Sequence, residues 1–174
     1  KRKTNRTFKY NASGPQYILQ KFGKQLFSRT SILRQMTTKN IQTIQIESKP
    51  ESIHIIERLV DDLKGEHNIH EDAYGNILVA VTEAVNNAIQ HGNKYNPNLK
   101  VKISYEVEND TISFAITDQG KGFDYYNLPD PTAPENLEKP TGRGVFLMKH
   151  LADQIIFSNN GSSVELFFKT GHVA

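Results

Sequence analysis

Two polar residues four positions apart, Glu83 and Asn87, carry the strongest chemical signal in the 174-residue chain. They fall within a long helical pattern, so this spacing places both side chains on one face of the helix. A carboxylate can act as a general base, and an amide oxygen is a neutral ligand for a hard metal ion. Such a pair suits phosphoryl transfer, although a polar stripe opposite an apolar stripe is also typical of a solvated helix face.

The helix that carries this pair is predicted to begin near His70 and to end at His91-Gly92-Asn93. Acidic residues follow His70 directly, which is favourable at a helix N-terminus. At helical periodicity, Ile77, Val81, Val85 and similar apolar side chains gather on a core face. The opposite face then holds Asn76, Ala80, Glu83, Asn87 and His91.

Two glycine motifs follow this helix and could supply the rest of a nucleotide site. Asp118-Gln119-Gly120-Lys121-Gly122 comes after a predicted strand, where glycines permit close approach of a ligand and the carboxylate can accept from an exocyclic amine. Thr141-Gly142-Arg143-Gly144 precedes a predicted helix, whose N-terminus can bind an anion. Taken alone, the first motif is more typical of an ordinary glycine-rich turn, and the second is about as typical of a glycine-rich helix start. Neither has the spacing of a Walker or Rossmann motif.

Composition places the chain among soluble globular proteins, with 37% hydrophobic and 23% charged residues. The chain has no cysteine, which excludes disulfides, thiolate metal sites and a cysteine nucleophile. No apolar run approaches the length of a membrane span. We therefore expect a cytoplasmic protein that does not enter a membrane.

The net charge of +2 hides an asymmetry between two parts of the chain. Residues 1–35 contain nine Lys and Arg and no Asp or Glu, whereas residues 36–174 carry a net charge of −7. We interpret residues 1–35 as a poorly ordered basic tail, or a segment not native to the domain, and residues 36–174 as one domain. A basic arm could also dock on nucleic acid, but the acidic domain offers no basic surface for it.

Alternating apolar and polar residues predict a sheet with helices on one face. Ile41, Ile44 and Ile46 predict a first, edge strand, and residues 99–107 and 111–116 predict a hairpin. A second hairpin is predicted at the C-terminal end, turned by Asn159-Asn160-Gly161. A proline-rich loop over residues 118–144 interrupts the pattern and is long enough to be functional.

The first predicted helix follows the edge strand and contains Ile53, Ile56, Leu59 and Leu63. Ser48 is the expected N-cap, with Pro50 in the first turn and Glu51 three residues after the cap. Gly65 is the expected terminator of this helix.

The three motifs in this order resemble the GHKL ATP-binding superfamily, which includes gyrase, histidine kinases and MutL. Val81-Thr82-Glu83, Asn87-Ala88-Ile89 and His91-Gly92 are especially similar to bacterial anti-sigma factors that are also serine-protein kinases. The resemblance covers residues 41–169 and implies an α/β two-layer sandwich with a mixed, mainly antiparallel sheet and about three helices. No H-E-x-x-[TN]-P motif occurs, which disfavours a complete histidine kinase.

By the resemblance, ATP would bind between the second helix and a lid loop at residues 118–144. Glu83 would be the general base and Asn87 the Mg²⁺ ligand. Asp118 would bind the adenine amine, and Gly120 and Gly122 would shape the adenine pocket. The phosphates would meet Gly142, Arg143 and Gly144, and Ser163 would lie where the family often has a threonine near the adenine.

The resemblance implies an anti-sigma factor that phosphorylates a serine or threonine of an antagonist, the anti-anti-sigma protein, and otherwise holds a sigma factor. It also suggests a homodimer. Two alternatives remain open at this point. The domain could bind a nucleotide or a partner protein without catalysis, or it could supply ATP binding to a two-component system.

Overall fold

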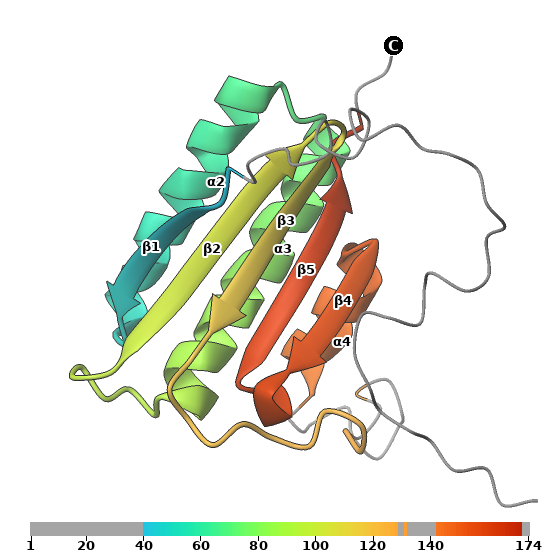
Figure 1. Cartoon of the computed structure of the whole chain (residues 1–174). Helices are drawn as coiled ribbons and strands as arrows, with labels where there is room; N and C mark the ends of the chain where they lie inside the picture. The colour runs from blue at the N-terminus through green and yellow to red at the C-terminus, as the bar shows by residue number, and fades with distance from the viewer. Residues whose placement is uncertain (1–39, 129–130, 132–141, 172–174) are drawn as a thin grey trace, which may run out of the picture. The chain divides into compact units, whose positions relative to one another are not determined.

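The computed structural model of the chain describes residues 40–128, 131 and 142–171. Its centre is a five-stranded sheet with the strand order β1-β2-β3-β5-β4 (Figure 1). Every pairing in this sheet is antiparallel, whereas we predicted a mixed, mainly antiparallel sheet. The strands are β1 (Gln42–Glu47), β2 (Lys100–Glu108), β3 (Thr111–Thr117), β4 (Gln154–Ser158) and β5 (Ser163–Lys169).

The helices of the described residues all lie on one face of the sheet, behind it in the view of Figure 1. Helix α3 runs between α2 and α4 and contacts both of them. This arrangement confirms the predicted two-layer α/β fold. The helices are α2 (Ile53–His67), α3 (Glu71–Asn87) and α4 (Arg143–Leu151), with short turns η3 (Pro50–Ser52), η4 (Ala88–Gly92) and η6 (Asn159–Gly161).

Alternation along the strands explains why the helices cover only one face. In β2, β3 and β5 every second side chain is apolar and mostly buried, and the residues between them are small, polar or charged except for the half-buried Phe167. The buried set packs against the helices in one core, where the rings of Tyr105 and Phe114 lie 6.1 Å apart. Its largest fully buried members are Phe114, Phe168, Ile56, Leu63, Ile77 and Ile103.

Ser48 does not cap the first helix, contrary to the sequence prediction. The helical segment begins with η3, and its flanking residue Lys49 makes no capping hydrogen bond with its side chain. Ser48 is instead fully buried and donates its hydroxyl to Leu99 O over 2.9 Å. The hydroxyl satisfies a carbonyl at the start of β2, a tertiary partner that local sequence cannot reveal. Pro50 occupies the first turn, as predicted.

Two further details of the helices differ from the predictions. Helix α2 continues past Gly65 to His67 and ends at Asn68, which adopts the left-handed conformation with φ 49°. Ala80 is fully buried rather than part of the polar stripe of α3. Because α3 lies between α2 and α4 as well as on the sheet, its buried surface is wider than one apolar stripe.

Some sequence predictions lie outside the described residues. These are the basic segment at residues 1–35 and the central part of the predicted lid loop, residues 129–130 and 132–141. Within the described part, no helix is long and apolar enough to cross a membrane.

The continuation of α2 through Gly65 makes a direct stability prediction. A Cβ at this position would meet no atom within 4 Å. The substitution Gly65→Ala should therefore raise the free energy of unfolding by about 0.5–1 kcal/mol in urea denaturation, because alanine loses less backbone entropy on entering a helix. A loss of stability would show instead that α2 ends at this residue.

Gly161→Ala is the contrasting control. Gly161 has φ 88°, and its Cβ would lie 2.6 Å from Phe123 O. This substitution should lower stability, because the new side chain meets backbone in a conformation that alanine disfavours.

Candidate functional site

A cavity of about 680 Å³ opens where α3, the N-terminus of α4 and the ends of the central strands meet. Its walls come from segments more than 80 residues apart in places, which the antiparallel sheet brings together. Seven of the nine site residues predicted from the sequence line this one cavity: Glu83, Asn87, Asp118, Gly122, Gly142, Arg143 and Gly144.

One end of the cavity is built from the polar pair on α3. Glu83 and Asn87 are half-buried, one helical turn apart. Gly144 at the start of α4 lies directly against them, since a Cβ there would stand 2.7 Å from Glu83 Oε2 and 3.0 Å from Asn87 Nδ2. The stripe that periodicity alone would leave in solvent is therefore partly covered by α4.

The N-terminus of α4 faces the same end of the cavity. Gly142 is the N-cap residue of α4 and has φ 88°, a left-handed conformation that favours glycine. No side-chain hydrogen bond from this N-cap residue caps the helix. The first N–H groups of a helix have no intrahelical partner, so this terminus can accept an anion. Arg143, the first residue of α4, adds an exposed guanidinium beside it.

The other end of the cavity is organised by Asp118. Its backbone N–H donates to Ser162 O over 3.0 Å, and its Oδ1 accepts from Gly120 N at 2.7 Å. Burial raises the pKa of the Asp118 carboxyl, while the hydrogen bond from Gly120 N acts in the opposite direction. One carboxylate oxygen is thus held by the turn, and the carboxyl group lies in the cavity wall.

Apolar side chains line the same cavity as this carboxylate. The rings of Phe123 and Phe157 lie 5.9 Å apart, edge to face, and both line the cavity. Ile116, Met148 and Val164 complete an apolar wall. A flat heterocycle carrying an amino group matches a wall with one carboxylate among apolar side chains.

Close backbone packing fixes the loop after β3. Gly122 has φ 76°, and a Cβ there would collide with Asn160 O. Phe123 N donates to the same carbonyl over 2.9 Å. The loop is therefore laid against the β4–β5 turn, which itself depends on the left-handed Gly161.

Two predicted site residues, Gly120 and Ser163, do not line the cavity. Gly120 packs against the carbonyl of Gly92, and its N–H binds Asp118. The Ser163 hydroxyl lies 2.9 Å from that of Thr117, its partner across β3 and β5. The residue before it, Ser162, lines the cavity instead.

Sequence reasoning did not assign site roles to Gly92, Phe123, Phe157 or Asn93. A Cβ at Gly92 would collide with the Asp118 carboxyl group, so the helix end and the loop touch. The glycine after His91 was a usable signal for this close approach. No local pattern distinguishes Asn93 from an ordinary loop asparagine, although the structure buries it.

The part of the chain that forms the cavity is similar to known proteins. A histidine kinase-like ATPase domain matches residues 46–168, a range that contains every residue of the cavity. The chain belongs to the histidine kinase-like ATPase domain family. In this ATPase domain, residues from all three motifs that the sequence singles out line the cavity.

The ATPase domain is similar to curated proteins named serine-protein kinase RsbW. The protein from Oceanobacillus iheyensis is 25% identical over 122 residues, covering 67% of this chain and 77% of the relative. The protein from Staphylococcus epidermidis is 25% identical over 138 residues, covering 75% and 87%.

A solved structure of RsbU and RsbW domains from Mycobacterium tuberculosis has the same fold. It superposes with a TM-score of 0.52 at 14% identity and covers 74% of this chain and 32% of that chain. This likeness supports the ATPase fold alone.

The environment of Asp118 predicts a specific pH dependence. Because the pKa is raised above its ordinary value of 3.8, the folded protein binds this proton more tightly than the unfolded chain does. Between the two pKa values, the contribution of Asp118 to the free energy of unfolding should fall as pH rises. Carbon NMR of the carboxyl group should give the raised pKa, and Asp118→Asn should remove this contribution. A pKa at or below the ordinary value would contradict the buried placement.

Proposed function

We propose that the domain binds Mg·ATP in this cavity and transfers the γ-phosphoryl group to a serine or threonine hydroxyl of an antagonist protein. The observation that carries the proposal is the placement of Glu83 and Asn87 beneath the N-terminus of α4, in the same cavity as Asp118. A carboxylate, a helix N-terminus and an apolar wall thus line one cavity, which supports this proposal.

Each end of the cavity suits a different part of ATP. The Asp118 carboxylate can accept a hydrogen bond from the adenine amine, and Phe123 and Phe157 can pack on the base. At the other end, the α4 N-terminus at Gly142–Gly144 and the Arg143 guanidinium can bind the phosphates. The absence of a side chain at Gly144 lets this terminus lie close to Glu83 and Asn87, because a methyl group there would contact both side chains.

The residues present fit a magnesium ion that is bound mainly through ATP. No group of three or more His, Asp or Glu in the described residues could hold a metal by itself. The Asn87 side-chain oxygen supplies one neutral hard ligand, and Mg²⁺ typically combines few protein ligands with substrate phosphates. When bound, Mg·ATP would supply the phosphoryl group with its charge partly neutralised.

Glu83 is the group that would handle the proton. As the acceptor hydroxyl oxygen bonds to the γ-phosphorus, the bond from that phosphorus to the β,γ-bridging oxygen breaks, and ADP leaves with the electron pair. The hydroxyl proton passes to the Glu83 carboxylate. Asn87, one turn along α3, holds its amide beside this carboxylate, and the neighbouring helix terminus stabilises negative charge on the phosphate.

The partners are proposed from the family resemblance and the names of the relatives. The relatives are named serine-protein kinases, which supports a protein hydroxyl as the acceptor. In the anti-sigma kinases that the chain resembles, the acceptor is an anti-anti-sigma protein and the second partner is a sigma factor. We propose the same two partners for this domain.

Replacing Glu83 separates catalysis from binding. Glu83→Ala should lower the rate of phosphate transfer from labelled ATP to the cognate antagonist by at least about a hundredfold, because the general base is lost. Mg·ATP affinity by calorimetry should stay within about threefold, since the phosphates rest on the α4 terminus. Glu108→Ala is the matched control and should transfer phosphate normally. Glu108 pairs with Thr111 at the turn of the β2–β3 hairpin, whereas Asp118 follows the other end of β3.

Transfer that survives in Glu83→Ala would overturn the assigned base. Normal Mg·ATP binding without any transfer by the wild-type protein would instead favour a nucleotide-binding module that sequesters its partner without catalysis.

A further inference from the structure

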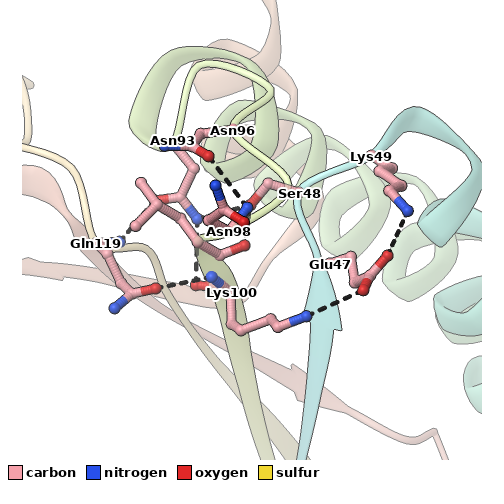
Figure 2. Close-up of polar contacts among 9 residues, drawn as sticks. Glu47, Ser48, Lys49, Asn93, Asn96, Asn98, Lys100 and Gln119 are labelled. Carbon is pink, nitrogen blue, oxygen red and sulfur yellow. Dashed lines mark hydrogen bonds and ion pairs between the residues drawn. The ribbon is translucent and has the colours of Figure 1, made fainter.

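The side chain of Asn93, just beyond the last turn of α3, is only 2% exposed and is fully hydrogen-bonded. Its Nδ2 donates to Ser48 Oγ over 2.8 Å and to Lys100 O over 3.1 Å. Its Oδ1 accepts from Gln119 N at 2.8 Å. Figure 2 shows this amide between the end of β1, the start of β2 and the loop after β3.

The bond to Gln119 reaches directly into the nucleotide-binding turn. Gln119 stands between Asp118, whose carboxyl lies in the cavity wall, and Gly120, whose N–H holds that carboxyl. The Gln119 side chain is anchored too, because its Oε1 accepts from Lys100 N at 2.7 Å (Figure 2). The turn is therefore held through its backbone by Asn93 and through a side chain by β2.

The same region joins the turn to the helix that carries Glu83 and Asn87. Asn93 N donates to Ala88 O over 2.8 Å, which closes the π-helical turn η4 at the end of α3. Gly92 touches the Asp118 carboxyl group, and Gly120 packs on the Gly92 carbonyl. A π-helical turn re-aims the backbone of a helix end and is frequent at functional sites. Here it directs the Asn93 amide at Gln119.

We infer that Asn93 is a positioning residue that sets Asp118 at the correct place for the base of ATP. The inference rests on the proposed nucleotide site. An amide is required because the position needs two donors and one acceptor at once, which leucine lacks entirely and an ionised carboxylate supplies only in part. Without the Asn93 amide, the Gln119 N–H loses its acceptor, and Lys100 O and Ser48 Oγ each lose a donor. The loss of the acceptor should release the turn.

The decisive comparison is Asn93→Leu with Ser48→Ala in the 174-residue chain. Both substitutions break the hydrogen bond between Asn93 and Ser48, but only Asn93→Leu removes the acceptor of the Gln119 N–H. Ser48→Ala therefore reproduces the general loss of buried polar contacts without touching the turn. Urea denaturation gives the stability loss of each variant.

Amide hydrogen exchange of the Gln119 N–H measures how firmly the turn is held. Asn93→Leu should speed exchange of the Gln119 N–H at least about tenfold more than its loss of global stability accounts for, because a local hydrogen bond is gone. Ser48→Ala should change this exchange only in proportion to its stability. Equal protection of the Gln119 N–H in both variants would overturn the inference.

Mg·ATP affinity is the second readout. Asn93→Leu should weaken binding at least about tenfold, and Ser48→Ala by less than about threefold, because only the first displaces Asp118. Asn93→Asp keeps an acceptor for Gln119 N and should retain tighter binding than Asn93→Leu. Equal affinity of the leucine and alanine variants would overturn the positioning role.

If Asn93→Leu does not fold, the exchange of the Gln119 N–H and the Mg·ATP affinity of Asn93→Asp test the inference. A protected Gln119 N–H together with near-normal ATP affinity supports the inference, and an exchanging Gln119 N–H with unchanged affinity overturns it. If the wild-type protein binds no Mg·ATP, the proposed function fails and the role toward ATP fails with it. The exchange experiment still determines separately whether Asn93 holds the turn.

Discussion

The structure depends on close packing between the C-terminal end of α3 and the turn after β3. Gly92 leaves just enough room for the Asp118 carboxyl group, and Gly120 lies on the Gly92 carbonyl. This contact lets one helix contribute to both ends of the cavity, with Glu83 and Asn87 at one end and its final turn against Asp118 at the other. A side chain at either glycine would push the two ends apart.

The same principle operates where α4 meets α3. Gly144 brings a helix terminus close to the carboxylate and amide of α3, and a larger residue there would require these side chains to shift. The result is a polar site in which Glu83 and Asn87 are covered yet still line an open cavity. Close glycine contacts therefore bring together the groups to which we assign the chemistry. The ion pairs of Glu47 with Lys49 and with Lys100 involve substantially exposed side chains, which contribute little to stability.

Sequence patterns could predict what is local. Helical periodicity placed Glu83 and Asn87 on one face, and strand alternation gave both hairpins and the sheet with helices on one side. Long-range pairings were not accessible, because they depend on strand register. The hydrogen bond of Ser48 with Leu99 joins residues 51 positions apart, and that of Asn93 with Gln119 joins residues 26 positions apart. In the sequence, Ser48 resembles an ordinary helix cap and Asn93 an ordinary loop residue. Ser162 rather than Ser163 reaches the cavity for the same reason, since register decides which of two adjacent serines turns inward.

The central claim is that Mg·ATP occupies the cavity between α3, α4 and the turn after β3. The most direct measurement is a titration of ¹⁵N-labelled protein with Mg·ATP, followed by backbone amide NMR. The account predicts that the largest shifts occur in residues 83–92, 118–123 and 142–145, with small shifts in β1 and in the outward-facing residues of β2. Absence of shifts in those three segments, or shifts confined to the uncovered face of the sheet, would contradict it.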